Sequence, residues 1–429
     1  MSLPDTPAPH IDYSLSNYLV FDNLILNNHP ETENTVDLKH NPFRFGGDLG
    51  SAELVDRAEE TSLVESTIRN GEKLFLVGPR RFGKTSILRA ADERLTGSGA
   101  IVLRLNAESF PTLEMLVEKI ISMAAIRLKS KVAAGIEQIE KFFSRLKPEF
   151  TYGGPMQELS VSIGVDTSAS ENQPVKPLTE ALDSLEKLAR AQPRSRPVGL
   201  IIDEFQAVVA RGGVEAEAQI RAAIQEHRRV GYVFAGSQTR LITEMLMNHD
   251  RPLYRLGSNR FIGPLPKADF SAYLLRQFKR SGFLVPDREP IESILSFAEE
   301  VPYNVQMLAH GCWEELRSRG QSKHAKLTSD LVFSVLRQTV KSLDPLFTQT
   351  WTRLTSVQQR ALIAVIRRQG TGMSSTEAAK STGITVPSLQ SALRSLHEHG
   401  ILRDDPAAGS VRTRFDDPFF AVWIRLTVM

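Results

Sequence analysis

The feature that most constrains this sequence is the stretch LFLVGPRRFGKTSILRA at residues 74–90. Four apolar residues are followed by a short segment with a glycine at each end, then by Lys-Thr and an amphipathic helical pattern. The segment matches the pattern G-x-x-x-x-G-K-[ST] in full, and a strand before it and a helix after it are the context that this pattern requires. The sequence therefore predicts a phosphate-binding loop between a buried strand and a helix.

The residue types in this loop suit phosphate chemistry. Consecutive backbone N–H groups would point at phosphate oxygens, and we expect Gly78 and Gly83 to supply the backbone freedom that this requires. Lys84 is predicted to reach the β- and γ-phosphates, and Thr85 to offer its hydroxyl to Mg²⁺. The segment predicted to bind ATP with Mg²⁺ comprises Gly78, Pro79, Arg80, Arg81, Phe82, Gly83, Lys84, Thr85 and Ser86.

Two later strand ends carry polar residues that complete this chemistry. LIIDEFQ at 200–206 delivers Asp203 and Glu204 at the carboxyl end of an apolar strand, where ligands of parallel sheets bind. We expect Asp203 to hold the magnesium ion and Glu204 to act as the general base on the attacking water. The strand YVFA at 232–235 ends in Gly-Ser-Gln, and Ser237 is favoured there as a γ-phosphate sensor. The alternative for Ser237 is an ordinary strand-to-helix turn.

Apolar runs alternate with helical patterns in the first part of the chain. Strands that alternate with helices indicate a parallel sheet with helices on both faces. Residues 134–176 interrupt the alternation, and ELSVSIGVD within them has the period-two pattern of a β excursion. The predicted strands are LFLV at 74–77, IVLRL at 101–105, VGLIID at 198–203, YVFA at 232–235 and RFIGPL at 260–265.

From about residue 267 the patterns are helical, and from about residue 350 they change again. Three helical segments at 356–370, 374–383 and 385–400 precede two short strands at 401–415, which is the order of a winged helix-turn-helix. We therefore divide the chain into an N-terminal arm or tail at 1–41, an α/β core at 42–266, a helical lid at 267–345 and a winged helix at 346–429.

The bulk composition excludes several classes of protein. A formal net charge of +2 gives no overall field that would draw the protein onto nucleic acid or a membrane. The single cysteine, Cys312, allows no disulfide within the chain and fits a reducing compartment. The N-terminus lacks the pattern of a signal peptide, and no apolar run approaches the roughly 20 residues of a membrane helix. We expect a cytoplasmic protein without a membrane partner.

Several short segments occur in order along the chain. They are NPFRFG at 41–46, GPRRFGKTSIL at 78–88, IIDEFQ at 201–206, GSQTRLI at 236–242, PLYR at 252–255, VPYNVQ at 301–306 and DDPFFAVWIR at 416–425. Together they resemble the archaeal-type ATPases, which belong to the STAND branch of AAA-like P-loop proteins and also occur in bacteria. The resemblance implies an α/β P-loop NTPase core with a parallel sheet, an all-α lid and a C-terminal winged helix.

The resemblance also implies further site residues. ELVDRAEE at 53–60 keeps the arginine of the family's Gly-Arg-Glu box near the adenine, Arg57, although Asp56 and Ala58 replace its glycine and glutamate. Pro302 keeps the proline that the family's lid places against the nucleotide. PLYR supplies Arg255 as a finger directed at the γ-phosphate of a neighbouring subunit. Arg251 is a second candidate for the finger, and a surface arginine is the alternative for either. Arg80 and Arg81 contact phosphate or a partner, or form a solvated loop tip.

Three functions fit these features. The first is a STAND-type switch, in which ATP binding and hydrolysis, slow without a partner, gate the packing of lid and winged helix in signalling, regulation or defence. The second is a DNA-acting ATPase, such as an initiator, a loader or a transposition accessory, with the winged helix on duplex DNA. The third is a scaffold without hydrolysis, which would not need Glu204. The partner is a protein of unknown identity or a second copy of the chain.

The winged helix itself favours weak DNA binding at best. Residues 353–429 contain ten arginines and lysines against six acids, which is only mildly basic. Leu389, Leu393 and Leu396 share one helical stripe that must face the core, so the opposite face carries one arginine, Arg394, and one glutamate. The predicted wing adds Arg412 and Arg414 for phosphate contacts. A surface facing another protein is the favoured interpretation.

Overall fold

The computed structural model describes residues 40–47, 54–128, 132–153, 158–164, 176–319, 325–407 and 410–429. The chain from Asp37 to Met429 belongs to one structural unit. Of the predicted N-terminal arm, residues 1–39 lie outside the described residues. No helix within the described ranges is long and apolar enough to cross a membrane.

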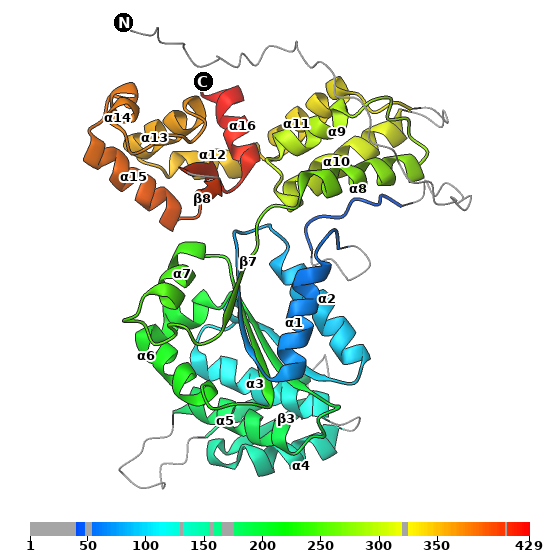
Figure 1. The fold of residues 1–429 in the computed structure, drawn as a ribbon, viewed down its shortest axis with the longest axis vertical. Coiled ribbons are helices and arrows are strands. Elements are labelled where there is room, and N and C mark those ends of the chain that lie inside the picture. Colours follow the sequence, from blue (N-terminus) through cyan, green and yellow to red (C-terminus); the bar gives the residue numbers. More distant parts are fainter. Residues whose placement is uncertain are drawn as a thin grey trace, which may run out of the picture. The chain divides into compact units, whose positions relative to one another are not determined.

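A parallel sheet forms the centre of the first part of the chain (Figure 1). In the part of the chain that the structure describes, its five strands follow the order β2-β5-β6-β1-β7. The predicted run at 260–265 becomes a shorter strand, because Pro264 and Pro266 have no backbone N–H to continue the pairing with β1. The strands are β1 (Lys73–Val77), β2 (Ile101–Asn106), β5 (Val198–Asp203), β6 (Val230–Gly236) and β7 (Ser258–Phe261).

Helices cover both faces of this sheet because alternate strand residues point to opposite sides. In β1, Leu74 and Leu76 pack with α1 and α2, whereas Phe75 and Val77 pack with α3, α5, α6 and α7. All four of these side chains are buried. This layered arrangement confirms the predicted α/β class. The helices are α1 (Ala58–Asn70), α2 (Lys84–Gly97), α3 (Leu113–Leu128), α5 (Pro177–Arg190), α6 (Gln206–Ile224) and α7 (Thr239–Met247).

The interruption at 134–176 contains an antiparallel hairpin. The period-two pattern correctly predicted β4, but its partner β3 was not expected from the sequence. Between its terminal proline and glycine, β3 has a polar–aromatic alternation of only four residues, 149–152, which is a short signal for a strand. The short elements of this region and of the loop after β2 are η1 (Ala107–Ser109), α4 (Val132–Phe142), η2 (Ser144–Leu146), β3 (Pro148–Gly153) and β4 (Glu158–Ile163).

The second half of the chain is helical up to a C-terminal hairpin. The predicted helices and hairpin of the winged helix are present, and one further helix, α16, follows them. The lid helices are α8 (Lys267–Arg280), α9 (Glu289–Phe297), α10 (Pro302–Ser318) and α11 (Ser329–Ser342). The remaining elements are α12 (Asp344–Thr352), α13 (Ser356–Arg367), α14 (Thr376–Thr382), α15 (Val386–Glu398), β8 (Leu402–Ala407), β9 (Ser410–Phe415) and α16 (Pro418–Thr427).

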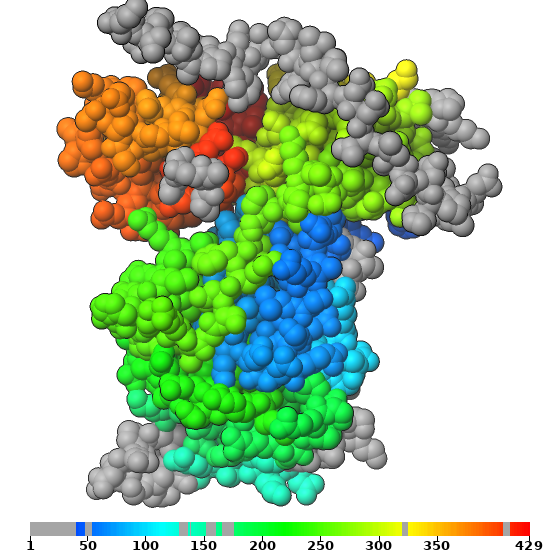
Figure 2. Space-filling model, in the orientation of Figure 1, coloured from blue at the N-terminus to red at the C-terminus, as the bar shows by residue number. Residues whose placement is uncertain are grey.

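Lid and winged helix share one hydrophobic core. A single cluster of buried side chains contains Trp313 of α10, Leu336 of α11, Leu396 of α15 and Phe419 of α16. Figure 2 shows these two parts as adjoining surfaces. Cys312 lies in the same core, and burial raises the pKa of its thiol, so it is a packing residue. The boundary predicted at 345/346 therefore falls within one continuous core.

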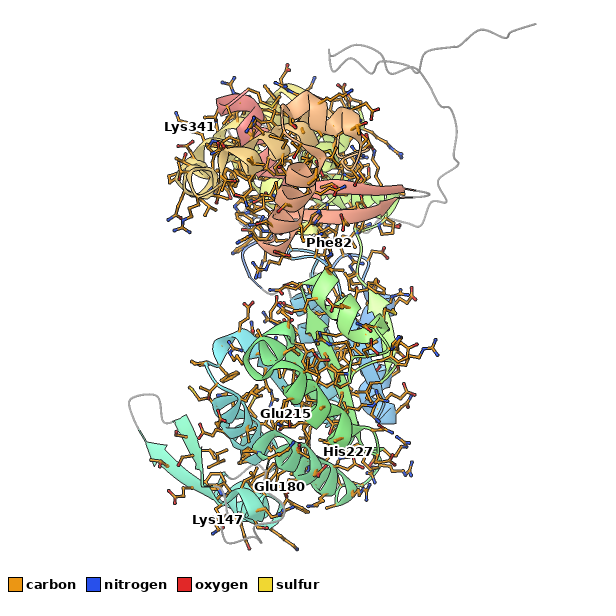
Figure 3. All side chains as sticks on the ribbon, turned by 90° about the vertical axis from the view of Figure 1, so that its left-hand side faces the viewer. Phe82, Lys147, Glu180, Glu215, His227 and Lys341 are labelled. Atoms are coloured by element: carbon orange, nitrogen blue, oxygen red, sulfur yellow. The ribbon has the colours of Figure 1, made fainter. Side chains whose placement is uncertain are left out.

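A buried polar network lies at the end of the sheet away from the predicted phosphate loop. His227 contacts the Tyr232 hydroxyl at 2.8 Å and Asp183 Oδ1 at 3.1 Å. Burial lowers the pKa of His227, so the network is held by a neutral ring. Figure 3 shows Phe82 of the loop at the opposite end of the α/β part from His227. This network therefore supports the fold and not the site.

Candidate nucleotide-binding site

The two glycines of the predicted phosphate loop are needed for different reasons. Gly83, which precedes α2, has a φ of +86°, which side chains other than glycine rarely adopt. At Gly78 a Cβ atom would lie 2.5 Å from the Ile262 carbonyl oxygen, so no side chain fits beside the segment after β7. The expectation of backbone freedom thus applies to Gly83, whereas Gly78 is required for close packing of two backbones.

Lys84 is the first residue of α2 and is buried. Its Nζ donates a hydrogen bond to the carbonyl oxygen of Pro79 at 2.8 Å, which spans the loop. Burial lowers the pKa of Lys84, and the negative charges of Glu204, Asp203 and Asp416 oppose that shift. Lys84 is therefore a buried cation of the loop, and it would attract the phosphate oxygens that the neighbouring carboxylates repel.

Thr85 and Asp203 meet at the base of the loop. The Thr85 hydroxyl donates to Asp203 Oδ2 at 2.7 Å, and the backbone N–H of Glu204 donates to Asp203 Oδ1 at 2.9 Å. Burial raises the pKa of Asp203, and the neighbouring Glu204 charge acts in the same direction. A hydroxyl and a carboxylate are the hard oxygen donors that Mg²⁺ prefers beside phosphate oxygens, so this pair fits the ion.

Glu204 follows β5 with a φ of +50°, which directs its side chain toward the next strand, β6. Its Oε2 accepts hydrogen bonds from the Ser237 hydroxyl at 2.7 Å and from Gln206 Nε2 at 2.5 Å. Ser237 stands at the end of β6, which lies between β1 and β5 in the sheet. The strand order thus brings together the two residues that the sequence placed on separate strands. Gln206 was not anticipated.

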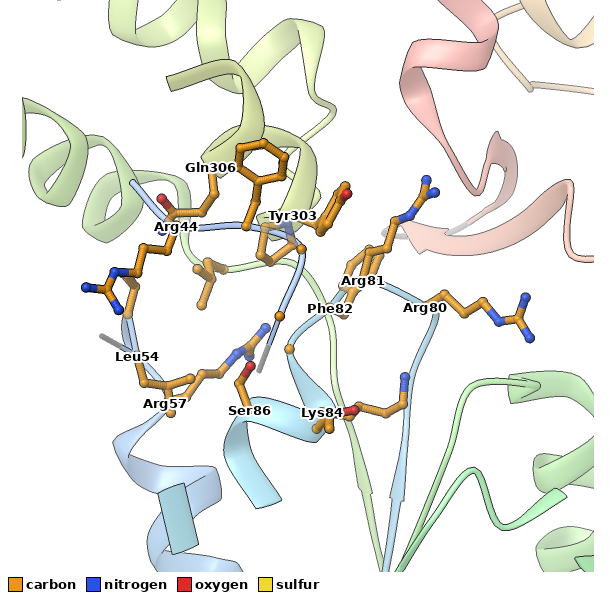
Figure 4. Close-up of a pocket in the computed structure, with 18 of the residues that line it drawn as sticks. Arg44, Leu54, Arg57, Arg80, Arg81, Phe82, Lys84, Ser86, Tyr303 and Gln306 are labelled. Carbon is orange, nitrogen blue, oxygen red and sulfur yellow. The ribbon is translucent and has the colours of Figure 1, made fainter. Parts of the chain in front are cut away.

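The loop opens into a cavity of about 410 Å³ (Figure 4). Apart from the loop itself, its lining comes from the N-terminal segment, the start of α1, the lid helices α8 and α10 and the residues that precede α8, together with Glu108 of η1 and Glu204 after β5. Of the site residues predicted outside the loop, Arg57, Glu204 and Pro302 line the cavity. The lining residues that were not predicted are Arg44, Phe45, Gly46, Gly47, Leu54, Val55, Glu108, Leu265, Phe270, Tyr303 and Gln306.

The segment NPFRFG packs on the lid. Phe43 is fully buried among Tyr273 and Phe278 of α8, and its carbonyl oxygen lies 2.7 Å from His310 Nδ1. Phe45 meets the ring of Tyr303 edge-on with centroids 5.9 Å apart. This contact explains why the segment stands beside the cavity, although it lies far from the lid in the sequence. Its role was missed because only the order of the motifs, and no chemistry, pointed to it.

Arg57 ties the start of α1 to the edge of the sheet. One Nη donates to the Gly263 carbonyl oxygen at 2.6 Å, and the other lies 3.4 Å from Glu60 Oε1. Burial lowers the pKa of Arg57, and Glu60 opposes this shift. The Arg57 side chain therefore holds the start of α1 to the sheet and also lines the cavity.

The tip of the loop contacts the lid and the C-terminal part of the chain. Arg81 forms a salt bridge with Asp417 Oδ2 at 2.5 Å and lies over the Tyr303 ring at 5.2 Å. Phe82 is buried, and the Arg403 guanidinium of β8 lies 5.1 Å from its ring centroid. Arg80, by contrast, forms an exposed salt bridge of 3.6 Å with Glu108.

The two arginines proposed as fingers have different surroundings. Arg251 forms an ion pair with the fully buried Glu217, so its guanidinium is engaged within its own subunit. Arg255 is exposed, has a φ of +51° and lies over the Tyr254 ring at 5.2 Å. Arg255 is not among the residues that line the cavity in the described part of the chain. Of the two candidates, only Arg255 presents its side chain outward.

A protein-family model matches the C-terminal part of the chain. The family model for the IclR helix-turn-helix domain matches residues 361–406, which include most of α13, α14, α15 and most of β8. No curated protein matches the chain. The family match covers only this C-terminal portion and concerns that domain alone.

Solved structures match over nearly the whole chain. A Walker-type ATPase of Pyrococcus abyssi is 19% identical, with a TM-score of 0.57, over 90% of this chain and 99% of that one. The Aeropyrum pernix ORC2 protein, solved as ADPNP–ADP complexes, is 13% identical over 87% of this chain and 95% of its own, with a TM-score of 0.48. The Aeropyrum pernix ORC1 protein in complex with DNA is 13% identical over 88% and 92%, with a TM-score of 0.44.

Only the first of these scores exceeds 0.5, and at 19% identity it establishes the fold. The chain thus has the fold of a P-loop ATPase with a helical lid and a C-terminal winged helix. The predicted resemblance to archaeal-type ATPases is confirmed at this level.

Proposed function

We propose that this protein is a Mg²⁺-dependent ATPase that works as a STAND-type switch, in which the bound nucleotide controls the packing of lid and winged helix. The output would be signalling, regulation or defence, delivered to a protein partner or to a second copy of the chain. Hydrolysis of ATP to ADP and phosphate would be slow without that partner. Both the site residues and the contacts of the loop tip support this proposal.

The site residues divide the work of hydrolysis. Lys84 and the loop N–H groups would bind the phosphates, and Thr85 and Asp203 would hold Mg²⁺, which neutralises phosphate charge when bound. Glu204 would accept a proton from the attacking water. Ser237 would hold Glu204 in place and would also sense the γ-phosphate. Arg57 and Pro302 would contact the nucleotide, and Arg255 would reach the γ-phosphate bound by a neighbouring subunit.

The observation that carries the switch is the position of one carboxylate, that of Asp417. It forms the salt bridge with Arg81 of the loop, and it accepts a hydrogen bond from Asn304 Nδ2 of the lid at 2.9 Å. It also caps α16 by accepting from the Phe419 N–H at 3.0 Å. Phosphate loop, lid and C-terminal helix therefore meet at one charged group.

The neighbouring Asp416 brings a second negative charge to the same place. Burial raises its pKa, whereas Arg81, Arg403 and Arg80 lower it. Its charge in turn acts on Lys84. A γ-phosphate bound at Lys84 would repel both carboxylates and compete for Arg81, whereas ADP lacks that charge. The triphosphate would thus weaken the contact between loop and α16, and this difference couples nucleotide to packing.

Hydrogen exchange of the full chain tests the switch. With Mg²⁺ and a non-hydrolysable ATP analogue, we expect amides of α16 to exchange several-fold faster than with ADP, because local opening becomes easier. In Asp417→Asn the amide still caps α16, but the charge is lost. Exchange in α16 should then be fast in both nucleotide states.

The matched control is Glu398→Gln, which removes an exposed carboxylate of α15 that is distant from the loop in sequence. It should behave as the wild type does. Equal exchange of α16 in the wild-type ADP and triphosphate states would count against the switch, whatever the variants do.

The alternative function is that of a DNA-acting ATPase. The observation in its favour is the match of residues 361–406 to a helix-turn-helix model. In α15 the structure buries Leu389, Leu393 and Leu396 and exposes Arg394, as expected. The wing is less available than the sequence suggested. Arg414 is paired with Glu299 and Asp405, and Arg412 Nε donates to the Gln369 carbonyl oxygen at 2.6 Å.

These internal contacts predict weak, non-specific binding to duplex DNA. A salt titration of the full chain should show at most about two or three neutralised phosphates. Arg394→Ala should change the affinity no more than Arg276→Ala on α8 of the lid does. Tight sequence-specific binding at physiological salt that is lost in Arg394→Ala would instead establish the DNA-acting alternative.

A further inference from the structure

Away from the phosphate loop, the cavity is lined largely by apolar side chains. In Figure 4, Leu54 and Gln306 lie across the pocket from Lys84. A nucleotide whose phosphates occupy the loop must extend its base toward this region, where a flat aromatic ring fits between apolar walls. The apolar lining residues outside the loop are Phe45, Leu54, Val55, Leu265, Phe270 and Pro302.

Gln306 is a polar group in these surroundings. It is 5% exposed, and it lines the cavity from the second turn of α10, one turn beyond Pro302. Its Nε2 donates to the Tyr273 hydroxyl at 3.3 Å. Its Oε1 has no hydrogen-bond partner among the described residues. Buried side-chain oxygens usually have a partner, so an acceptor of this kind beside a cavity suits a ligand donor.

We propose that Gln306 Oε1 accepts a hydrogen bond from the exocyclic amino group of adenine and so selects ATP over GTP. Adenine carries an N–H donor at this position of the ring, whereas guanine carries a carbonyl oxygen. Two acceptors facing each other in a buried site would repel and would leave both unsatisfied. This specificity rests on the proposed function, because it needs a nucleotide whose phosphates lie in the loop.

A ligand series combined with one substitution tests the proposal. The three ligands are ATP, GTP and purine riboside triphosphate, which lacks the amino group but is otherwise ATP. The wild type should bind ATP roughly tenfold more tightly than the purine riboside compound, as expected for one buried hydrogen bond. GTP should bind more weakly than either.

In Gln306→Leu the acceptor is replaced by an apolar side chain of similar length. This variant should bind ATP and purine riboside triphosphate equally, because only the wild type can use the amino group. Gln349→Leu makes the same change on the exposed face of α12 and should keep the wild-type preference. The loss of discrimination, and not merely of affinity, distinguishes base reading from a structural role of Gln306.

The outcomes separate this proposal from the proposed function. Equal wild-type affinity for ATP and purine riboside triphosphate would overturn the role of Gln306 while leaving ATP binding intact. A wild-type preference for GTP would also overturn it, since the amide would then present its nitrogen. If none of the three ligands bound, the proposed function itself would fail. The wild-type series decides the question even if Gln306→Leu does not fold.

Discussion

Replacement of Glu204 by glutamine is expected to lower ATP turnover by roughly 10²–10⁴-fold while nucleotide affinity stays close to that of the wild type. Glutamine keeps the shape of the side chain and can still bond to Ser237, which now lies 2.7 Å from the carboxylate. It cannot accept the proton of the attacking water. Phosphate release under saturating ATP, together with calorimetric titration, measures the two quantities separately.

Glu93→Gln is the matched control, because Glu93 is paired with Arg89 on the surface of α2 and is not among the described residues that line the cavity. Its turnover should be that of the wild type. Unchanged hydrolysis in Glu204→Gln would assign the general base to another residue.

Arg255→Ala tests whether a second subunit takes part in hydrolysis. If Arg255 acts in trans, the turnover per subunit of the wild type rises with protein concentration, and that of Arg255→Ala does not. Wild-type turnover that is independent of concentration would exclude this role.

Replacement of Lys84 by alanine is expected to weaken ATP binding at least tenfold, or about 1.4 kcal/mol. Two effects contribute to the loss. The variant lacks the ammonium charge that attracts phosphate, and the loop loses the hydrogen bond between Lys84 Nζ and the Pro79 carbonyl oxygen. Calorimetric titration with ATP and Mg²⁺ measures the difference.

Arg89→Ala provides the comparison, since it removes a cation from the same helix at a position paired with Glu93 on the surface. Its ATP affinity should equal that of the wild type. A melting curve without nucleotide shows whether Lys84→Ala is folded. A folded variant with wild-type affinity would mean that the phosphate site has been assigned to the wrong residues.

Local sequence patterns were sufficient to predict the helices and strands whose formation depends on residues that are close together in the sequence. The apolar run ending at Val77 and the helical period after Lys84 predicted β1 and α2, because burial on both faces of a sheet requires such runs. β3 was not predicted because its polar–aromatic alternation covers only four residues, 149–152, and the strand forms by pairing with β4. Strand length at β7 was overestimated because the prolines after it end the pairing.

The site was predictable only where its residues share a motif. Asp203 and Glu204 could be identified beside the loop because strand ends of a parallel sheet converge. Arg81, Tyr303 and Asp417 lie more than 100 residues apart in the sequence, and their contacts follow from packing of the lid and of α16. The acceptor of Gln306 likewise can be recognised only when its burial, and its lack of a partner among the described residues, are known.

The common core of lid and winged helix makes α10 a lever arm. Pro302, at the start of this 17-residue helix, lines the cavity, while Trp313 further along is embedded in the core that includes Phe419. A helix of this length spans about 25 Å, so a tilt of roughly 10° at its cavity end displaces the far end by about 4 Å. Close-packed cores move as bodies and do not absorb such shifts by compression. A small adjustment around a nucleotide would therefore be magnified at the surface of the winged helix.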